Sequence, residues 1–203
     1  MVDISVSDHA AMYSVLTITG SPAATSRSAL LAQTVAQQLA RDGYAVRSLH
    51  VRDLPAEALL QADFSHAGIV DAVRQLASAD AVVVATPIYK AAYSGVLKAF
   101  LDLLPQTSLQ GKIVLPLATG GSPAHLLAVD YALRPVLHAL GARHILGAVY
   151  ASDAQVSGDA ITGYRISPEI ADRLQAGVRE LNAGLAASRP RTIPVDERER
   201  LYA

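Results

Sequence analysis

The sequence contains no cysteine and no tryptophan, and only 5% of its 203 residues are aromatic. Without cysteine the chain cannot form disulfides, use a thiol nucleophile or hold zinc through thiolates. The six histidines show no HExxH or comparable ligand spacing, so the sequence predicts no metal site. A GxSxG motif is also absent, which leaves Ser-His-Asp hydrolase chemistry with little support.

The sequence also lacks an excess of charge of either sign and has no long apolar run. The formal net charge is −1 and no basic stripe is present, so nucleic acid is not an expected partner. No apolar run reaches membrane-spanning length, and the first eleven residues lack the pattern of a signal peptide. The sequence therefore predicts a soluble, cytoplasmic protein with no membrane partner.

What the chain does have is enough apolar residues, 51%, for one well-buried core. We expect one domain over residues 13–187, preceded by an N-terminal extension, 1–12, and followed by a charged C-terminal tail, 188–203. Met12 stands directly before the first strand, so residues 1–11 are either a loose extension or precede the true start of the protein at Met12.

Strand-like and helix-like patterns alternate through this domain. Strands are predicted at 13–19, 45–51, 81–86, 112–119 and 144–151, and helices at 26–41, 66–78, 94–104, 123–140 and 168–187. Residues 52–64 and the stretch after residue 151 are predicted to be irregular, and Pro116 fits awkwardly inside its strand. The alternation predicts an α/β fold, a three-layer sandwich with a five-stranded parallel sheet. Ligands bind such sheets beyond the carboxyl ends of the strands, which directs attention to 20–28, 86–95 and 119–125.

The first of these loops, "GSPAATSRS", ends in an arginine between two serines. Ser26 is a plausible N-cap, and Arg27 and Ser28 add a forked cation and a hydroxyl at a predicted helix start. Free N–H groups and the helix dipole favour an anion there, and the loop is neither GxGxxG nor a Walker A motif. The alternative is that Ser26 only caps the helix and Arg27 is a solvated surface residue.

The other two loops bring aromatic residues and glycines to the same edge. Tyr89 and Tyr93 follow the third strand, together with Lys90 and Ser94, although both tyrosines could instead pack the loop onto the core. The segment after the fourth strand offers a backbone that a planar ligand can approach, with one histidine that is either a donor or a surface residue: Thr119, Gly120, Gly121, Ser122 and His125. A phosphate cradle, aromatic neighbours and a glycine platform together suit FMN better than a dinucleotide.

These residues carry a resemblance to a known family. The segments "GSPAATSRS", "ATPIYKAAYSGVLKAFLDLLP", "GKIVLPLATGG", "AHLLAVDYALRPVL" and "YASDAQV" are similar to those of NADPH-dependent FMN reductases of the flavodoxin-like superfamily. Among them, the chain most resembles the FMN reductases that serve alkanesulfonate monooxygenases, and the resemblance spans roughly residues 13–187.

The resemblance implies a reductase that passes hydride from NADPH to FMN and supplies FMNH2 to a separate FMN-dependent alkanesulfonate monooxygenase for sulfur acquisition. It places the FMN phosphate at Ser21, Ser26, Arg27 and Ser28, and the ring and ribityl chain at Pro87, Ile88, Tyr89, Lys90, Thr119, Gly120, Gly121 and Ser122. Ser94 and His125 complete the expected cofactor-binding set. Hydride passes directly between the two nucleotides, so no catalytic side chain is named.

Pro135 carries a separate prediction for the helix at 123–140. A proline in a helix lacks an N–H and clashes with the carbonyl four residues back, here that of Tyr131. A kink or a single-turn π-bulge around Tyr131 is the expected relief. The resemblance implies a π-helix at this tyrosine, at the interface of a homotetramer (or dimer), whereas the simpler alternative is an ordinary kink with a core tyrosine.

Two competing functions remain on sequence grounds. One is a quinone, azo or metal-ion reductase that keeps FMN bound, and the other is a non-enzymatic flavodoxin-type electron carrier. Carriers of that type are usually acidic, whereas this chain is near neutral. No basic cluster that would read the 2′-phosphate of NADPH is evident, so the choice between NADPH and NADH stays open at this point.

Overall fold

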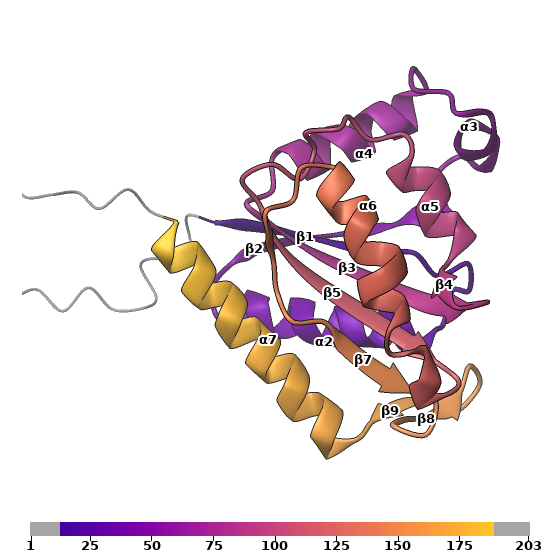
Figure 1. Ribbon diagram of the computed structural model, residues 1–203, viewed down its shortest axis with the longest axis vertical. Coiled ribbons are helices and arrows are strands. Elements are labelled where there is room, and N and C mark those ends of the chain that lie inside the picture. The colour runs from indigo at the N-terminus through magenta and orange to yellow at the C-terminus, as the bar shows by residue number, and fades with distance from the viewer. Residues whose placement is uncertain (1–12, 189–203) are drawn as a thin grey trace, which may run out of the picture.

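Five strand positions form a parallel sheet at the centre of the computed structural model, which describes residues 13–188 (Figure 1). The strand order is β2-β1-β3-β5-β6, with β1 (Ser14–Thr19), β2 (Ala45–His50), β3 (Ala81–Tyr89), β5 (Ile113–Gly120) and β6 (His144–Ile145). This order reverses direction between β1 and β3, as in a doubly wound sheet, and confirms the predicted α/β architecture.

The predicted fifth strand is divided into two pieces. β6 pairs with Ile113 and Val114, whereas β7 (Val149–Ser152) pairs with residues 117–120 of the same neighbour, β5. Pro116 lies in the interval between these two pairings and remains aligned with Val84 of β3 on the other side. A proline has no N–H to donate to a ladder. The fifth strand is therefore broken beside Pro116, where β5 has no N–H to donate to it. The break explains how a proline can stand inside β5.

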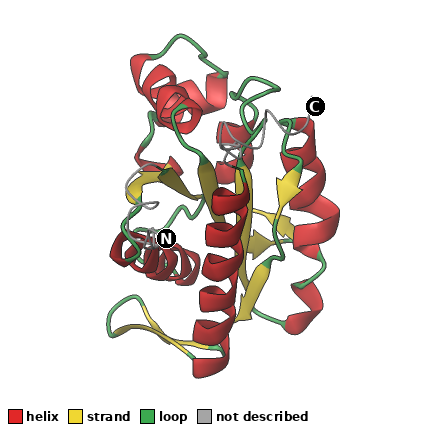
Figure 2. Cartoon of the chain, turned by 90° about the vertical axis from the view of Figure 1, so that its left-hand side faces the viewer, coloured by secondary structure: helices red, strands yellow, loops and turns green. Residues whose placement is uncertain are grey.

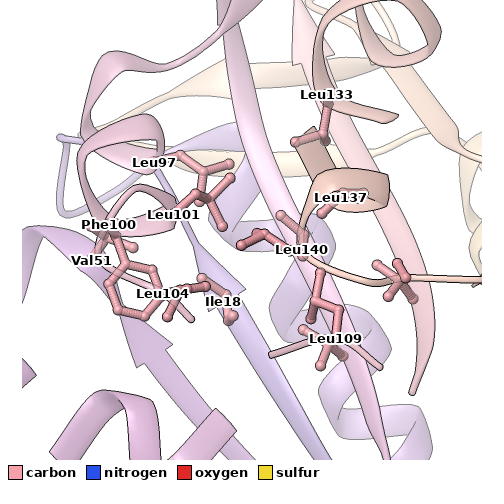
Figure 3. Packing of buried hydrophobic residues seen from close by; sticks show 14 of the residues in the cluster. Ile18, Val51, Leu97, Phe100, Leu101, Leu104, Leu109, Leu133, Leu137 and Leu140 are labelled. Carbon is pink, nitrogen blue, oxygen red and sulfur yellow. The ribbon is translucent and has the colours of Figure 1, made fainter. Parts of the chain in front are cut away.

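Helices cover both faces of the sheet. On one face lie α2 (Arg27–Arg41) and α7 (Pro168–Ala187), whose apolar side chains pack in one cluster with those of the strands. On the other face lie α4 (Ala67–Ala77), α5 (Gly95–Leu101) and α6 (Arg134–Ala139), with a second cluster that includes Ile18, Phe100 and Leu137 (Figure 3). Within residues 13–188, no helix is both long and apolar enough to cross a membrane.

Two segments expected to be irregular contain regular structure. Residues 51–61 hold a 3₁₀ turn, Val51–Asp53, and the short helix α3 (Ala56–Gln61). Residues 156–166 form an antiparallel hairpin of β8 (Val156–Asp159) and β9 (Gly163–Ile166), which projects at one end of the molecule (Figure 2). The loop predicted after residue 151 was therefore wrong over this stretch.

The long helix predicted over 123–140 is broken into three short pieces. A 3₁₀ turn, Pro123–His125, is followed by a π-helical segment, Val129–Leu133, and then by α6. The N–H of Arg134 donates to the carbonyl of Val129, five residues back, as a π-turn requires. The π-bulge expected around Tyr131 from Pro135 is thus confirmed, and the single long helix is wrong.

A tight hairpin ends the third strand. β3 pairs with the short β4 (Ala92–Tyr93) through Ile88 and Tyr89, which leaves a two-residue turn between them. Both turn residues, Lys90 and Ala91, have positive φ, 49° and 62°. Turns of this kind fit the twist of a hairpin, but they favour Asn and Gly because other residues are strained at positive φ.

Candidate functional site

The loop between β1 and α2 is fixed from two sides. The N–H of Gly20 donates to the carbonyl of Ala85 in β3 at 2.8 Å, and the hydroxyl of Ser94 donates to the carbonyl of Gly20. A side chain at position 20 would not fit, because its Cβ would lie 2.5 Å from the Cβ of Leu97 in α5. The chain therefore leaves the sheet here in one closely defined path.

The loop leads into the N-terminus of α2, where several backbone N–H groups have no hydrogen-bond acceptor in the described part of the chain. Within residues 13–188, the backbone N–H groups of positions 24–28 make no hydrogen bond. Ser26 is the N-cap, and its Oγ accepts from the N–H of Ala29 at 3.1 Å. A row of free N–H groups at the positive end of a 15-residue helix is suited to an oxyanion such as a phosphate monoester.

A cavity of about 210 Å³ opens beside this helix start. It lies at the carboxyl ends of β1, β3 and β5, where the strand order reverses. Its lining comes from five separate segments: Ser21, Ala23, Thr25, Ser26, Arg27, Pro87, Ile88, Tyr89, Thr119, Gly120, Gly121, Asp153 and Tyr164.

Arg27 connects the helix start to the β8–β9 hairpin. Its Nε donates to the carbonyl of Val156 at 2.8 Å, and its Nη2 lies 3.4 Å from the carbonyl oxygen of Gly158. Its guanidinium carbon stands 4.8 Å from the centre of the Tyr164 ring, within cation–π range. Arg27 is therefore not a freely solvated surface residue, which was the alternative on sequence grounds. Its guanidinium is held in the wall of the cavity.

The opposite wall carries the glycines predicted to approach a planar ligand. A Cβ at Gly120 would lie 2.6 Å from the hydroxyl of Tyr150, so this position is closed to side chains. That hydroxyl donates to the carbonyl of Ser122 at 2.5 Å. Burial and the nearby Asp153 carboxylate raise the pKa of Tyr150, which keeps the donating proton in place. A Cβ at Gly121 would meet nothing within 4 Å, so this glycine leaves open space beside the cavity.

The predicted site residues divide into two groups. Nine of them line the one cavity: Ser21, Ser26, Arg27, Pro87, Ile88, Tyr89, Thr119, Gly120 and Gly121. The other five lie outside its lining: Ser28, Lys90, Ser94, Ser122 and His125.

The five outlying residues have other surroundings. Ser28 is fully buried, with its Oγ 3.4 Å from that of Ser26, and Ser94 caps α5 by accepting from the N–H of Leu97. Lys90 is exposed on the strained turn. Ser122 caps the 3₁₀ turn that follows β5, and His125 ends that turn with its Nδ1 buried and unpaired among the described residues. For these five, a contact with a flavin remains a prediction.

Two charged or aromatic lining residues escaped the sequence analysis. Asp153 follows the fifth strand directly, within the quoted block "YASDAQV", so its position at a strand end was a usable signal. Tyr164 had no such signal, because it reaches the cavity only through the β8–β9 hairpin.

A larger cavity, about 370 Å³, lies away from these strand ends, between α4 and the segment 105–112. Its one cation, Lys112, already donates to the carbonyls of Ala77 and Ala79, and burial lowers its pKa. Among its described lining residues there is neither the start of a helix nor a cation without a partner, so we place the functional site at the carboxyl ends of the strands.

The donor set of that site fits FMN. The free N–H row and Arg27 suit a phosphate monoester, which carries about −1.5 to −2 charge. The hydroxyls of Ser21 and Thr119 and the apolar surfaces of Pro87, Ile88 and Tyr89 stand next to these donors in the same lining.

Comparison with known proteins identifies the family of the chain. A family model described as NADPH-dependent FMN reductase matches residues 13–156. The chain is 44% identical over 180 residues to an FMN reductase (NADPH) of Pseudomonas putida, covering 88% of this chain and 91% of the relative. It is 48% identical over 161 residues to an FMN reductase (NADPH) of Escherichia coli, covering 79% of this chain and 82% of the relative.

Solved structures agree on the fold. The apo form of an NADH:FMN oxidoreductase (EMOB) superposes with a TM-score of 0.76 at 43% identity, covering 90% of this chain and 92% of that one. A flavodoxin of Streptococcus pneumoniae gives a TM-score of 0.56 at 20% identity, covering 84% and 98%, which shows that the fold is flavodoxin-like. The family match covers most of the residues that build the sheet and its cavity, and the chain therefore belongs to the NADPH-dependent FMN reductases.

Proposed function

We propose that this reductase takes hydride from NADPH and delivers it to FMN held in the strand-end cavity, with FMN treated as a substrate that leaves after reduction. The observation that carries the proposal is the row of free N–H groups at residues 24–28 beside the Arg27 guanidinium. Membership of the family supports the flavin and nicotinamide partners.

In this proposal the residues of the chain bind the flavin and orient its ring. The N-terminus of α2 and Arg27 would hold the phosphate, whereas Pro87, Ile88 and Tyr89 would flank the ring and Thr119–Gly121 the ribityl chain. FMN, when bound, would supply the hydride-accepting ring. Because hydride passes directly from one ring to the other, orientation is what the protein contributes, and no side-chain acid or base is assigned.

The destination of the reduced flavin is the finer part of the proposal. The resemblance of the block at 85–105, "ATPIYKAAYSGVLKAFLDLLP", supports a cytoplasmic two-component system with an FMN-dependent alkanesulfonate monooxygenase, used for sulfur acquisition. A reductase in such a system must release FMNH2. Its site therefore has to bind flavin weakly enough for the flavin to dissociate after each turnover. NADPH is the proposed donor, and NADH is the alternative because one similar structure is an NADH:FMN oxidoreductase.

We place the oligomer interface on the π-helical segment. Tyr131 is 79% exposed there, and Leu126 and Leu127 next to it are also exposed. The segment lies against β4, which pairs with the end of β3 that carries Tyr89. An apolar surface of this kind beside a site supports a homotetramer, or a dimer, assembled close to the flavin.

Steady-state oxidation of NADPH, with and without added free FMN, tests the proposal. The expected result is a colourless protein whose NADPH oxidation depends on added FMN. A yellow protein that reduces quinones or dyes without added FMN would favour the FMN-retaining reductase instead. No oxidation under either condition would leave a flavodoxin-type carrier. NADH in parallel assays decides the nicotinamide, and sulfonate turnover with the purified monooxygenase tests the partner.

A further inference from the structure

We propose that Asp153 weakens the site's hold on the FMN phosphate, so that the flavin is released between turnovers. This inference rests on the proposed function and adds to it a residue that sets affinity. Asp153 lines the cavity, and its Oδ1 lies 3.5 Å from the Nε of Arg27. No other carboxylate is in the cavity lining of the described chain.

The backbone holds Asp153 in this position. The N–H of Asp153 donates to the carbonyl of Gly120 at 3.0 Å, directly after β7. Its side chain remains 47% exposed, and its one ion pair is that with Arg27 among the described residues. A carboxylate is thus fixed at the edge of the site that a phosphate would enter, facing the cation that the phosphate would use.

Electrostatics gives the direction of the effect. The guanidinium and the N-terminus of α2 together supply roughly +1.5 charges, of which the helix contributes about 0.5. The Asp153 carboxylate cancels about two thirds of that attraction for a phosphate dianion. A unit charge about 6 Å from a bound dianion, at the dielectric constant of water (about 80) that suits a half-exposed side chain, changes the binding constant roughly tenfold.

A merely structural role for Asp153 predicts the opposite sign. If Asp153 were needed to hold Arg27 in place, its removal would weaken FMN binding. Arg27 has other anchors, however, since its Nε donates to the carbonyl of Val156 at 2.8 Å and its guanidinium lies over Tyr164. The Asp153–Arg27 pair is partly exposed and contributes little to holding the side chain.

Dissociation constants for FMN and riboflavin, measured by quenching of flavin fluorescence, test the inference on the full chain. Riboflavin lacks the phosphate, so its dissociation constant responds to changes elsewhere in the site but not to a change in phosphate binding. In Asp153→Asn, which keeps the size of the side chain, we expect FMN to bind about tenfold more tightly and to dissociate correspondingly more slowly. Riboflavin should change less than twofold. Asp153→Ser provides a second variant with the same charge change.

The matched control is Asp172→Asn, which removes one negative charge from the exposed surface of α7 and should leave both constants unchanged. Weaker or unchanged FMN binding in Asp153→Asn, or equal tightening of riboflavin, would overturn the inference while leaving FMN turnover by the wild type in place. A wild-type protein that neither binds nor reduces FMN would overturn the proposed function together with this inference.

Discussion

The hydroxyl of Ser94 joins the start of α5 to the loop that precedes α2, because it donates to the carbonyl of Gly20 and accepts from the N–H of Leu97 at 3.1 Å. Both groups are buried, so one side chain satisfies the helix cap and the loop at once. Ser94 therefore shapes the loop that would hold the phosphate, and its contact with the flavin stays a prediction.

Ser94→Ala should therefore lower stability and weaken flavin binding together. We expect a loss of about 2 kcal/mol in the free energy of unfolding, from the missing cap and the unpaired carbonyl of Gly20. Urea denaturation and FMN titration measure the two effects. Ser167→Ala is the control, because Ser167 caps α7 by accepting from the N–H of Ile170 at 3.4 Å. It should cost about 1 kcal/mol and leave FMN affinity unchanged. Equal affinity in both variants would contradict the role given to Ser94.

Gly120→Ala should be destabilising by about 1 to 3 kcal/mol, because its Cβ would lie 2.6 Å from the Tyr150 hydroxyl. The next ring atoms of Tyr150 stand 3.4 Å away, so the hydroxyl causes most of the clash. Tyr150→Phe alone removes the hydrogen bond to Ser122 and should cost about 1 kcal/mol. In the double variant the two costs should not add, and strict additivity in thermal unfolding would show that the clash lies elsewhere.

Ala91→Gly should stabilise the protein by up to about 1 kcal/mol, because Ala91 sits at a φ of 62° that glycine adopts without strain. The measurement is the urea midpoint at unchanged m-value. Ala92→Gly, one residue later in β4, is the matched control and should destabilise, since glycine weakens a strand. A destabilised Ala91→Gly variant would mean that the turn is not strained in solution.

Tyr131→Ala tests the proposed interface. The side chain is 79% exposed, so the free energy of unfolding of the chain itself should change by no more than about 0.5 kcal/mol. The mass in solution, measured by light scattering, should fall from that of the proposed tetramer or dimer toward a smaller species, and transfer of FMNH2 to the proposed monooxygenase partner should fall with it. Ile161→Ala on the hairpin, at a side chain 95% exposed, should change neither. An unchanged mass for Tyr131→Ala would remove this segment from the interface.

Local patterns in the sequence were sufficient for much of this structure. Strand-like and helix-like patterns alternate in the sequence. From this alternation the parallel strands and the two long helices, α2 and α7, were predicted close to their observed positions. Pro135 removes one donor at a known distance from Tyr131, which predicted either a kink or a π-turn there, and the resemblance favoured the π-turn that the structure has. The three strand-end loops met in one cavity because parallel strands end at one edge of a sheet.

What failed depends on contacts between distant segments. The run "HILGAVYA" is continuous in the sequence, and its division follows from Pro116 of the neighbouring strand. The strands β8 and β9 have one buried residue between them, Val156, so neither shows the apolar alternation that marks a strand. For the same reason the sequence could not predict that Tyr164 lines the cavity or that the hairpin contacts Arg27.

The central claim is that the N-terminus of α2 and Arg27 recognise the flavin phosphate. The most direct test is kcat/KM for FMN against riboflavin, with NADPH as donor, in the wild type and in Arg27→Gln. The account predicts that the wild type strongly prefers FMN, and that the variant loses about 10- to 100-fold for FMN, since hydrogen bonds to charged groups contribute about 1.5–3 kcal/mol. Riboflavin turnover should be nearly unchanged. A wild type that uses both flavins equally well would contradict the account.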